Sequence, residues 1–165
     1  MLKKFLFAIT FVLATSFSTL AQDPPENEVV AGYTYLRGDE LKANLNGFNF
    51  SYTRYLNDNF GVTSEIGANF DSGINTFTYL IGPQIAANRG GRVSPFAHIL
   101  VGGGRVSIED FGSSNGFAVA LGGGVDVKLN DKVSIRPIQI DYLPIRFNGG
   151  TIHNGRVGAR INFRF

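Results

Sequence analysis

The chain has 165 residues, 44% of them hydrophobic, and it contains 21 glycines, two histidines and no cysteine. Without cysteine the fold has no disulfide framework, and two histidines provide no recognised spacing of metal ligands. The 15 Lys and Arg stand against 13 Asp and Glu and are spread along the chain, which argues against a nucleic-acid surface. We therefore expect no metal, no other cofactor and no nucleic-acid partner.

The first segment, MLKKFLFAITFVLATSFSTLAQ, has the layout of a secretory signal peptide. Lys3 and Lys4 precede an apolar run over 5–13, and small residues lead up to Ala21, after which we place the cleavage. The alternative, an amino-terminal membrane anchor, is disfavoured because a spanning helix needs about 20 apolar residues. Loss of residues 1–21 removes two lysines, so the exported chain has 13 basic and 13 acidic residues.

We expect residues 22–27, QDPPEN, to be a flexible lead-in to a single domain over 28–165. In that domain, segments rich in Tyr, Phe, Val, Ile and Gly are separated by turn-like clusters, and no stretch has a sustained helical period. The pattern predicts eight strands, at 28–37, 46–56, 60–70, 76–87, 93–106, 116–128, 133–146 and 156–165.

Several of these segments alternate between apolar residues and small or charged ones. In the third segment Phe60 and Ile66 share one face, whereas Thr63 and Glu65 share the other. In the last segment, NGRVGARINFRF, one face is apolar and the other carries three arginines, and the pattern runs on to Phe165. A strand of this kind needs one apolar and one polar environment.

The connections between the predicted strands fall into two groups. Those after the even strands (LNDN, NRGGR, LNDK) are tight and contain the residues that tolerate hairpin dihedrals. Those after the odd strands (GDELKAN, DSGIN, SIEDFGSSN, NGGTIHN) are looser and polar. An even strand number, with short turns at one end and longer loops at the other, is typical of transmembrane barrels, whose termini face the periplasm.

The strand length fits a membrane. Phe60 and Phe70 bracket the third segment, and the intervening chain extends roughly 33 Å as a strand. With a tilt of about 40° it spans about 25 Å, the height of the apolar band of such barrels. The fold class we predict is therefore all-β, an eight-stranded antiparallel up-and-down transmembrane β-barrel.

The faces that turn away from lipid carry charge, which must be paired in a narrow interior. Arg136 can face inward together with Asp141 only if the strand bulges near Pro137. The small residues Gly122 and Gly124 are expected to make room for the arginines. We predict a lumenal charge network that comprises Glu65, Asp126, Arg136, Asp141, Arg156, Arg160 and Arg164.

Six stretches carry a family resemblance: GYTYLR (32–37), TYLIGPQ (78–84), VSPFAHILVGGGR (93–105), FAVALGGGVDVKLNDKVSIR (117–136), DYLPIRF (141–147) and the terminal FRF. On these residues the chain resembles the small outer-membrane β-barrels of the OmpA-like superfamily, the porin-family or outer membrane protein beta-barrel domain proteins. The resemblance implies insertion in a Gram-negative outer membrane and a terminal signal, Phe163 and Phe165, read by the barrel-assembly machinery. Because the last strand ends the sequence, we expect no peptidoglycan-binding domain.

Some barrels of similar topology are lipid A deacylases or palmitoyl transferases, which need a nucleophile or a His with a carboxylate partner near one rim. His153 lies in a predicted outer loop, where Ser113 or Ser114 of another loop could approach it. His98 lies mid-strand, and if Ile99 faces lipid then His98 is a hydrogen-bonding histidine of the lumen. The glycine-rich stretches VGGGR (101–105) and LGGGV (121–125) lack the Lys-Ser/Thr of a phosphate-binding loop. We therefore expect no enzyme activity.

Two further functions stay open on the sequence alone. A soluble periplasmic barrel would turn the apolar faces inward around an apolar ligand, and a small-solute channel is possible by family label. Eight strands enclose an interior that side chains just fill, which disfavours a wide pore. The function we predict is that of a monomeric outer-membrane barrel, surrounded by lipid, with a structural or surface-interaction role and an unknown extracellular ligand at its loops.

Overall fold

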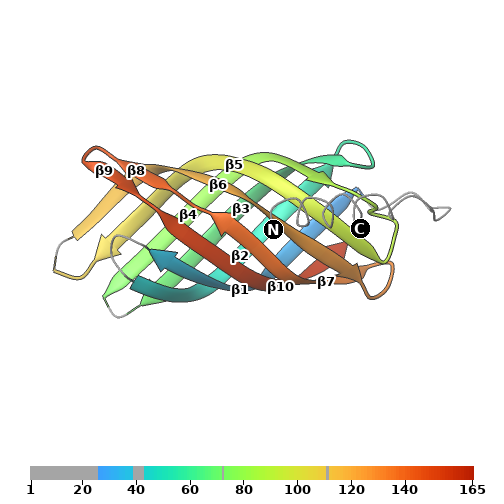
Figure 1. Cartoon of the computed structure of the whole chain (residues 1–165), viewed down its shortest axis with the longest axis horizontal. Helices are drawn as coiled ribbons and strands as arrows, with labels where there is room; N and C mark the ends of the chain where they lie inside the picture. Colours follow the sequence, from blue (N-terminus) through green and yellow to red (C-terminus); the bar gives the residue numbers. More distant parts are fainter. Residues whose placement is uncertain (1–25, 39–42, 72, 111) are drawn as a thin grey trace, which may run out of the picture.

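The computed structural model describes residues 26–38, 43–71, 73–110 and 112–165, which form one antiparallel sheet (Figure 1). The predicted signal peptide lies outside these residues. Within the described ranges, no helix is long and apolar enough to cross a membrane. The strands are β1 (Asn27–Gly38), β2 (Ala43–Tyr55), β3 (Phe60–Asp71), β4 (Ile74–Ala86), β5 (Val93–Ile108), β6 (Gly112–Lys128), β7 (Val133–Tyr142), β8 (Ile145–Phe147), β9 (Gly150–Ile152) and β10 (Asn154–Arg164).

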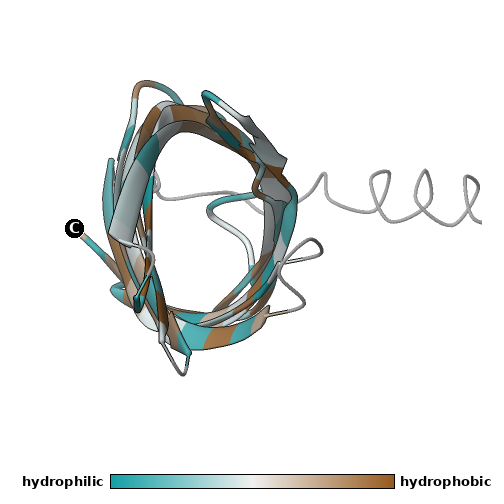
Figure 2. Ribbon diagram, turned by 90° about the vertical axis from the view of Figure 1, so that its left-hand side faces the viewer, coloured by the Kyte–Doolittle hydropathy of each residue, from teal (hydrophilic) through white to brown (hydrophobic). Residues whose placement is uncertain are grey.

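The sheet closes on itself. Each strand from β1 to β7 pairs with its sequence neighbour, β10 pairs with both β1 and β7, and the β5–β6 pairing completes the ring seen end-on in Figure 2. The short hairpin β8–β9 extends from this ring and pairs with β6 through β8. The prediction of a closed, eight-stranded antiparallel barrel is confirmed.

The seventh predicted strand, 133–146, is not continuous. It breaks after Tyr142, at Leu143 and Pro144, and resumes as β8, because proline has no N–H to donate to a sheet ladder. Closer to the turn, β7 contains one extra residue relative to both β6 and β10, which places Pro137 and Ile138 together on the outer surface. This bulge is the one that the sequence required for Arg136 to face inward.

Two of the short turns are held by an asparagine side chain. In LNDN the Asn57 side chain accepts hydrogen bonds from the backbone N–H of Asn59 and Phe60, and in LNDK Asn130 does the same for Lys132 and Val133. These side chains replace backbone partners at the turn, as Asn commonly does.

The looser connections at the opposite end are shorter than predicted. β4 begins at Ile74, β5 runs to Ile108 and β6 begins at Gly112, so most of DSGIN and SIEDFGSSN is strand. Polar strand ends, such as Ser107 in register with Ser113, resemble a loop in composition although their backbones stay paired. The β8–β9 hairpin lies at this end, opposite the C-terminus (Figure 1).

The barrel is apolar outside and largely polar inside. Along β10 the odd residues, such as Phe163, are exposed, whereas Arg156 on the other face is 1% exposed. On β2 Phe48 is 71% exposed and its neighbour Asn49 is 3% exposed. Burying arginine and exposing phenylalanine is favourable only where the exterior meets lipid rather than water.

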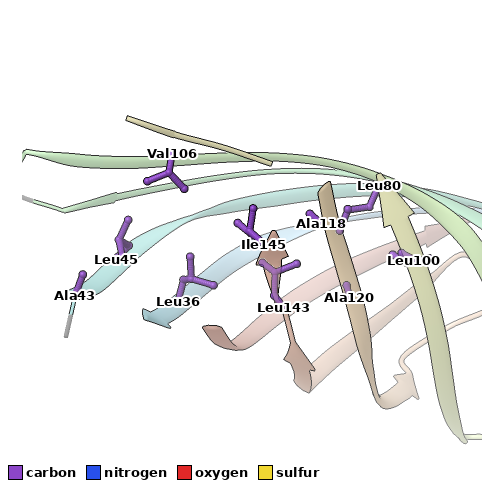
Figure 3. Packing of buried hydrophobic residues seen from close by; sticks show 10 residues of the cluster. All are labelled: Leu36, Ala43, Leu45, Leu80, Leu100, Val106, Ala118, Ala120, Leu143 and Ile145. Carbon is purple, nitrogen blue, oxygen red and sulfur yellow. The ribbon is translucent and has the colours of Figure 1, made fainter. Parts of the chain in front are cut away.

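The lumen has two parts along its length. Towards the β8–β9 end, ten side chains form a packed apolar cluster that crosses the barrel (Figure 3). Its members are Leu36, Ala43, Leu45, Leu80, Leu100, Val106, Ala118, Ala120, Leu143 and Ile145. The remaining length, towards the short turns, is occupied by charged and amide side chains and ends in a small group, Tyr55, Ala86 and Phe96.

Candidate functional site in the barrel lumen

A first group of charges lies close to the short-turn end. Arg136 Nε donates to Asp126 Oδ1 at 2.7 Å, and its Nη2 donates to Glu28 Oε1 at 3.1 Å. Arg164 Nε donates to the other Glu28 oxygen at 3.0 Å, and Arg164 Nη2 lies 3.6 Å from Asp126. Two acids and two arginines from β1, β6, β7 and β10 thus neutralise one another.

A second group lies deeper in the lumen. Arg156 Nη2 bridges Glu65 at 2.6 Å and Asp141 at 2.7 Å, and its Nε also donates to Asp141 at 2.9 Å. Arg160 Nη1 donates to the second oxygen of Glu65 at 3.2 Å. His98 Nε2 lies 2.9 Å from Asp141 Oδ1. All five side chains are buried, so each charge depends on its partners for solvation.

Gln139 joins the two groups. Its amide oxygen accepts a hydrogen bond from Arg136 at 2.9 Å, and its amide nitrogen donates to Asp141 at 2.9 Å. The lumen therefore contains one continuous hydrogen-bonded network, in which removal of a single member changes the surroundings of the others.

Backbone geometry makes room for this network. A Cβ at Gly122 would lie 2.1 Å from an Asp141 carboxylate oxygen, and a Cβ at Gly124 would lie 2.3 Å from the Ile138 carbonyl oxygen and 3.0 Å from the Phe96 ring. The expectation that these glycines make room for arginines is therefore wrong in its detail. They admit the acid that holds Arg156, and the ring on which Arg136 stacks at 3.8 Å.

The connection between β4 and β5 places a buried arginine at the short-turn mouth. Arg89 in this turn is buried, and its guanidinium carbon lies 3.2 Å from the centroid of the Tyr55 ring. Burial lowers the pKa of Arg89 below its ordinary value. The Arg89 carbonyl lies 3.5 Å from Arg164 Nη1, which ties the turn to the network.

All seven residues that the sequence singled out lie in this network. The sequence missed a fourth acid, Glu28, and it did not assign Gln139 or Arg89 to the lumen. The charge count was a usable signal, because four arginines against three acids leave one positive charge without a counter-ion. His98 faces the lumen and contacts Asp141, in the orientation inferred from Ile99.

The rim histidine and serine considered for a hydrolase each contact another residue. His153 Nδ1 hydrogen-bonds the Tyr142 hydroxyl and its ring stacks on Tyr142, while Ser113 accepts a hydrogen bond from Arg105 at 2.7 Å. Among the described residues, no cluster of three His, Cys, Asp or Glu could hold a metal ion.

The terminal aromatics lie on the outer surface. Phe163 and Phe165 are both exposed, and the Phe165 backbone exchanges two hydrogen bonds with Asn27 on β1, each 3.0 Å long. The last residue therefore closes the seam between the first and last strands.

Known structures share this architecture. Neisserial surface protein A superposes with a TM-score of 0.69 at 16% identity, over 85% of this chain and 97% of that one. Ail, the attachment invasion locus protein of Yersinia pestis, gives 0.62 at 18% identity, over 86% and 99% of the two chains. The barrel domain of Pseudomonas aeruginosa OprF gives 0.57 at 14% identity, over 87% and 100%. These identities support the fold alone.

A comparison with curated protein sequences gives no significant match. In contrast, the sequence model of one family, the outer membrane protein beta-barrel domain, matches residues 7–165. The match, the closed barrel and the apolar exterior agree, and they confirm the resemblance found in the sequence. The chain belongs to the outer membrane protein beta-barrel domain family and is an integral protein of the outer membrane.

Proposed function

We propose that this barrel is a closed, monomeric scaffold of the outer membrane, which conducts no solute and presents its outer strand ends for surface interaction. The observation that carries the proposal is that buried side chains meet across the lumen in both of its parts. Charges paired across the barrel occupy one part, and a packed apolar cluster occupies the other.

The two parts block passage for different reasons. An ion that enters the charged part must displace a partner from a buried ion pair, which costs several kcal/mol. A hydrated solute that enters the apolar part must part side chains such as Leu100 and Ile145, which are completely buried. Because the two barriers lie in series, loosening one of them leaves the lumen closed.

The outer end supports the interaction role. The β5–β6 and β8–β9 hairpins extend at the end opposite the short turns, and outer-membrane barrels have their short turns in the periplasm. Two structural neighbours are named as a surface protein and an attachment invasion protein, and an exposed, stable scaffold fits roles of that kind.

Planar-bilayer conductance of the refolded barrel tests the closed lumen. We expect no stable conductance steps at low voltage, while a boiling-dependent shift in gel mobility shows that the same sample is folded and inserted. Discrete, reproducible steps from folded protein would contradict the proposal and favour a small-solute channel.

We also propose that Phe163 and Phe165 act as the assembly signal, and that residues 1–21 are cleaved as a signal peptide. The two rings face outward and add little to the lumen. Phe165→Ser should therefore reduce insertion by the barrel-assembly machinery much more than it reduces stability after refolding in detergent. The matched control is Ile161→Ser, because Ile161 lies on the same outward face of β10, four residues before Phe165. Equal insertion of the wild type and Phe165→Ser would exclude this role.

A further inference from the structure

The outer surface of β4, β5 and β6 contains a polar hollow near the outer end of the barrel. Its volume is about 500 Å³. It lies between the β3–β4 turn and the β5–β6 hairpin, and we call it the β4–β6 hollow. Its lining includes Asn75, Arg105, Ser107, Glu109 and Ser113.

Strand register fixes the height of this hollow. Arg105 is in register with Phe77 on β4 and with Asn115 on β6. One pair of residues nearer the membrane, Gly103 is in register with Tyr79 and with Phe117. Exposed aromatic rings on such barrels mark the edge of the apolar band. The hollow therefore begins where the acyl chains end and the lipid headgroups begin.

The hollow differs from the same boundary on the opposite side of the barrel. On β1 and β2 the polar groups satisfy one another, because Tyr33 donates to Asn46, and Tyr35 donates to Asn44 at 2.6 Å. In the hollow Arg105 donates through Nη2 to Ser113, while Asn75 and Ser107 face the same space. Among the described residues, Arg105 thus adds a cation to a concave polar surface on this side of the barrel.

We propose that the β4–β6 hollow binds the headgroup of a phosphorylated glycolipid of the outer leaflet. Arg105 matches a phosphate, since a guanidinium forms charge-assisted hydrogen bonds to phosphate oxygens. The hydroxyls of Ser107 and Ser113 and the Asn75 amide match sugar hydroxyls. The adjacent rings of Phe77 and Phe117 lie where the acyl chains of the same lipid leave the headgroup.

The single acid of the lining orients the headgroup. Glu109 lies at the Gly73 side, where its carboxylate would be 3.3 Å from a Cβ at Gly73. A carboxylate repels phosphate and accepts hydrogen bonds from hydroxyls. The phosphate is therefore placed at Arg105 and a sugar hydroxyl at Glu109. This inference deepens the surface-interaction role proposed above, and it does not depend on whether the lumen conducts.

The test is a titration of the detergent-refolded barrel with bisphosphorylated lipid A, followed by native mass spectrometry. Arg105→Glu should weaken binding roughly tenfold or more, as expected for the loss of a charge-assisted contact. Arg37→Glu is the control, because Arg37 is also exposed near the outer end but lies on β1, away from the hollow. Heat-modified gel mobility shows that each variant is folded, and fully dephosphorylated lipid A should bind wild type and Arg105→Glu equally.

Three results would overturn the proposal. Unchanged binding by folded Arg105→Glu would exclude a phosphate contact at Arg105. Equal weakening by Arg37→Glu would show that the effect depends on general surface charge and not on the hollow. Tight binding of the acyl-free phosphorylated disaccharide, at the affinity of the lipid, would assign the hollow to a soluble glycan. If lipid binding fails these tests but the bilayer recording shows no conductance, the closed scaffold is retained and only the lipid site is rejected. If the barrel conducts but Arg105 is needed for lipid binding, the closed scaffold is rejected and the lipid site is retained.

Discussion

The two halves of the lumen close the same barrel by different physical means. Near the short turns, four acids and four arginines pair with one another across the lumen. Near the β8–β9 hairpin, apolar side chains meet across the lumen without any charge among the buried members of the cluster. Electrostatic pairing closes one half, and volume filling closes the other.

This difference indicates what each half tolerates. A buried ion pair gains little over an apolar replacement, but a single unpaired buried charge is expensive. An apolar cluster has no such rule of pairing, and its stability depends on how completely the space is filled. The charged half should therefore respond to charge balance, and the apolar half to volume.

The largest effect is expected at Asp141, which contacts Arg156, His98 and Gln139. Asp141→Asn keeps the shape and removes the charge, so Arg156 and Arg160 then share Glu65. We expect a loss of about 3–5 kcal/mol in the free energy of unfolding, as for a broken buried ion pair. Urea titration in lipid vesicles, with the folded fraction read from gel mobility, measures it.

A charge-restoring second substitution provides the control. Asp141→Asn combined with Arg156→Gln leaves no excess charge, and the two losses should be non-additive by about 0.5–3 kcal/mol. Strict additivity would mean that Asp141 stabilises the barrel through contacts other than this ion pair.

In the apolar half, Leu100→Ala should cost about 2–4 kcal/mol, because Leu100 is completely buried and its removal leaves a cavity. Leu100→Met, which keeps the volume, should cost less than about 1.5 kcal/mol in the same unfolding assay. If the two variants were equally stable, the cluster would not be closely packed.

A smaller effect is expected where a glycine supports the charged half. In Gly122→Ala the new methyl would meet the Asp141 carboxylate and the backbone of Ile140 at 2.3 Å, so a strand must shift. We expect a loss of about 1–3 kcal/mol. Gly155→Ala, which has open space around the new methyl, is the matched control and should change the unfolding free energy by less than about 0.5 kcal/mol.

The smallest effect concerns an exposed pair outside the network. A hydrogen bond from Lys128, 2.8 Å away, lowers the pKa of Asp131 below its usual value. A carboxylate with a lowered folded-state pKa stabilises the fold above the unfolded pKa, and this contribution is lost as the pH falls through the folded pKa. The melting temperatures of wild type and Asp131→Asn should differ slightly at pH 7 and converge in acid. A difference that grows in acid would have the wrong sign.

The outer face was readable from the sequence because lipid requires an apolar residue at every second position. The arginines of β10 were equally clear, since their face contains no large apolar residue. Glu28 was missed because the inward face of β1 also carries Val30 and Leu36, which breaks the alternation. A single strand does not show which of its mixed faces is lumenal.

The apolar cluster was missed for a related reason. Leu36, Leu80 and Leu100 have the composition of lipid-facing residues, and only closure of the sheet places them opposite one another inside the barrel. The extent of the outer strands was underestimated because polar residues on paired strands beyond the membrane resemble loops. Both features depend on contacts between distant strands, which local patterns do not report.

The closed lumen is tested most directly by thiol labelling, which is clean because the chain has no cysteine. Ala120→Cys places a thiol at a completely buried position in the apolar cluster, and Asn148→Cys places one on the exposed β8–β9 turn. In barrels folded into lipid vesicles, a small water-soluble thiol reagent should label Asn148→Cys and leave Ala120→Cys unmodified until the barrel is unfolded. Rapid labelling of folded Ala120→Cys would show that water reaches the middle of the lumen and would contradict the closed barrel.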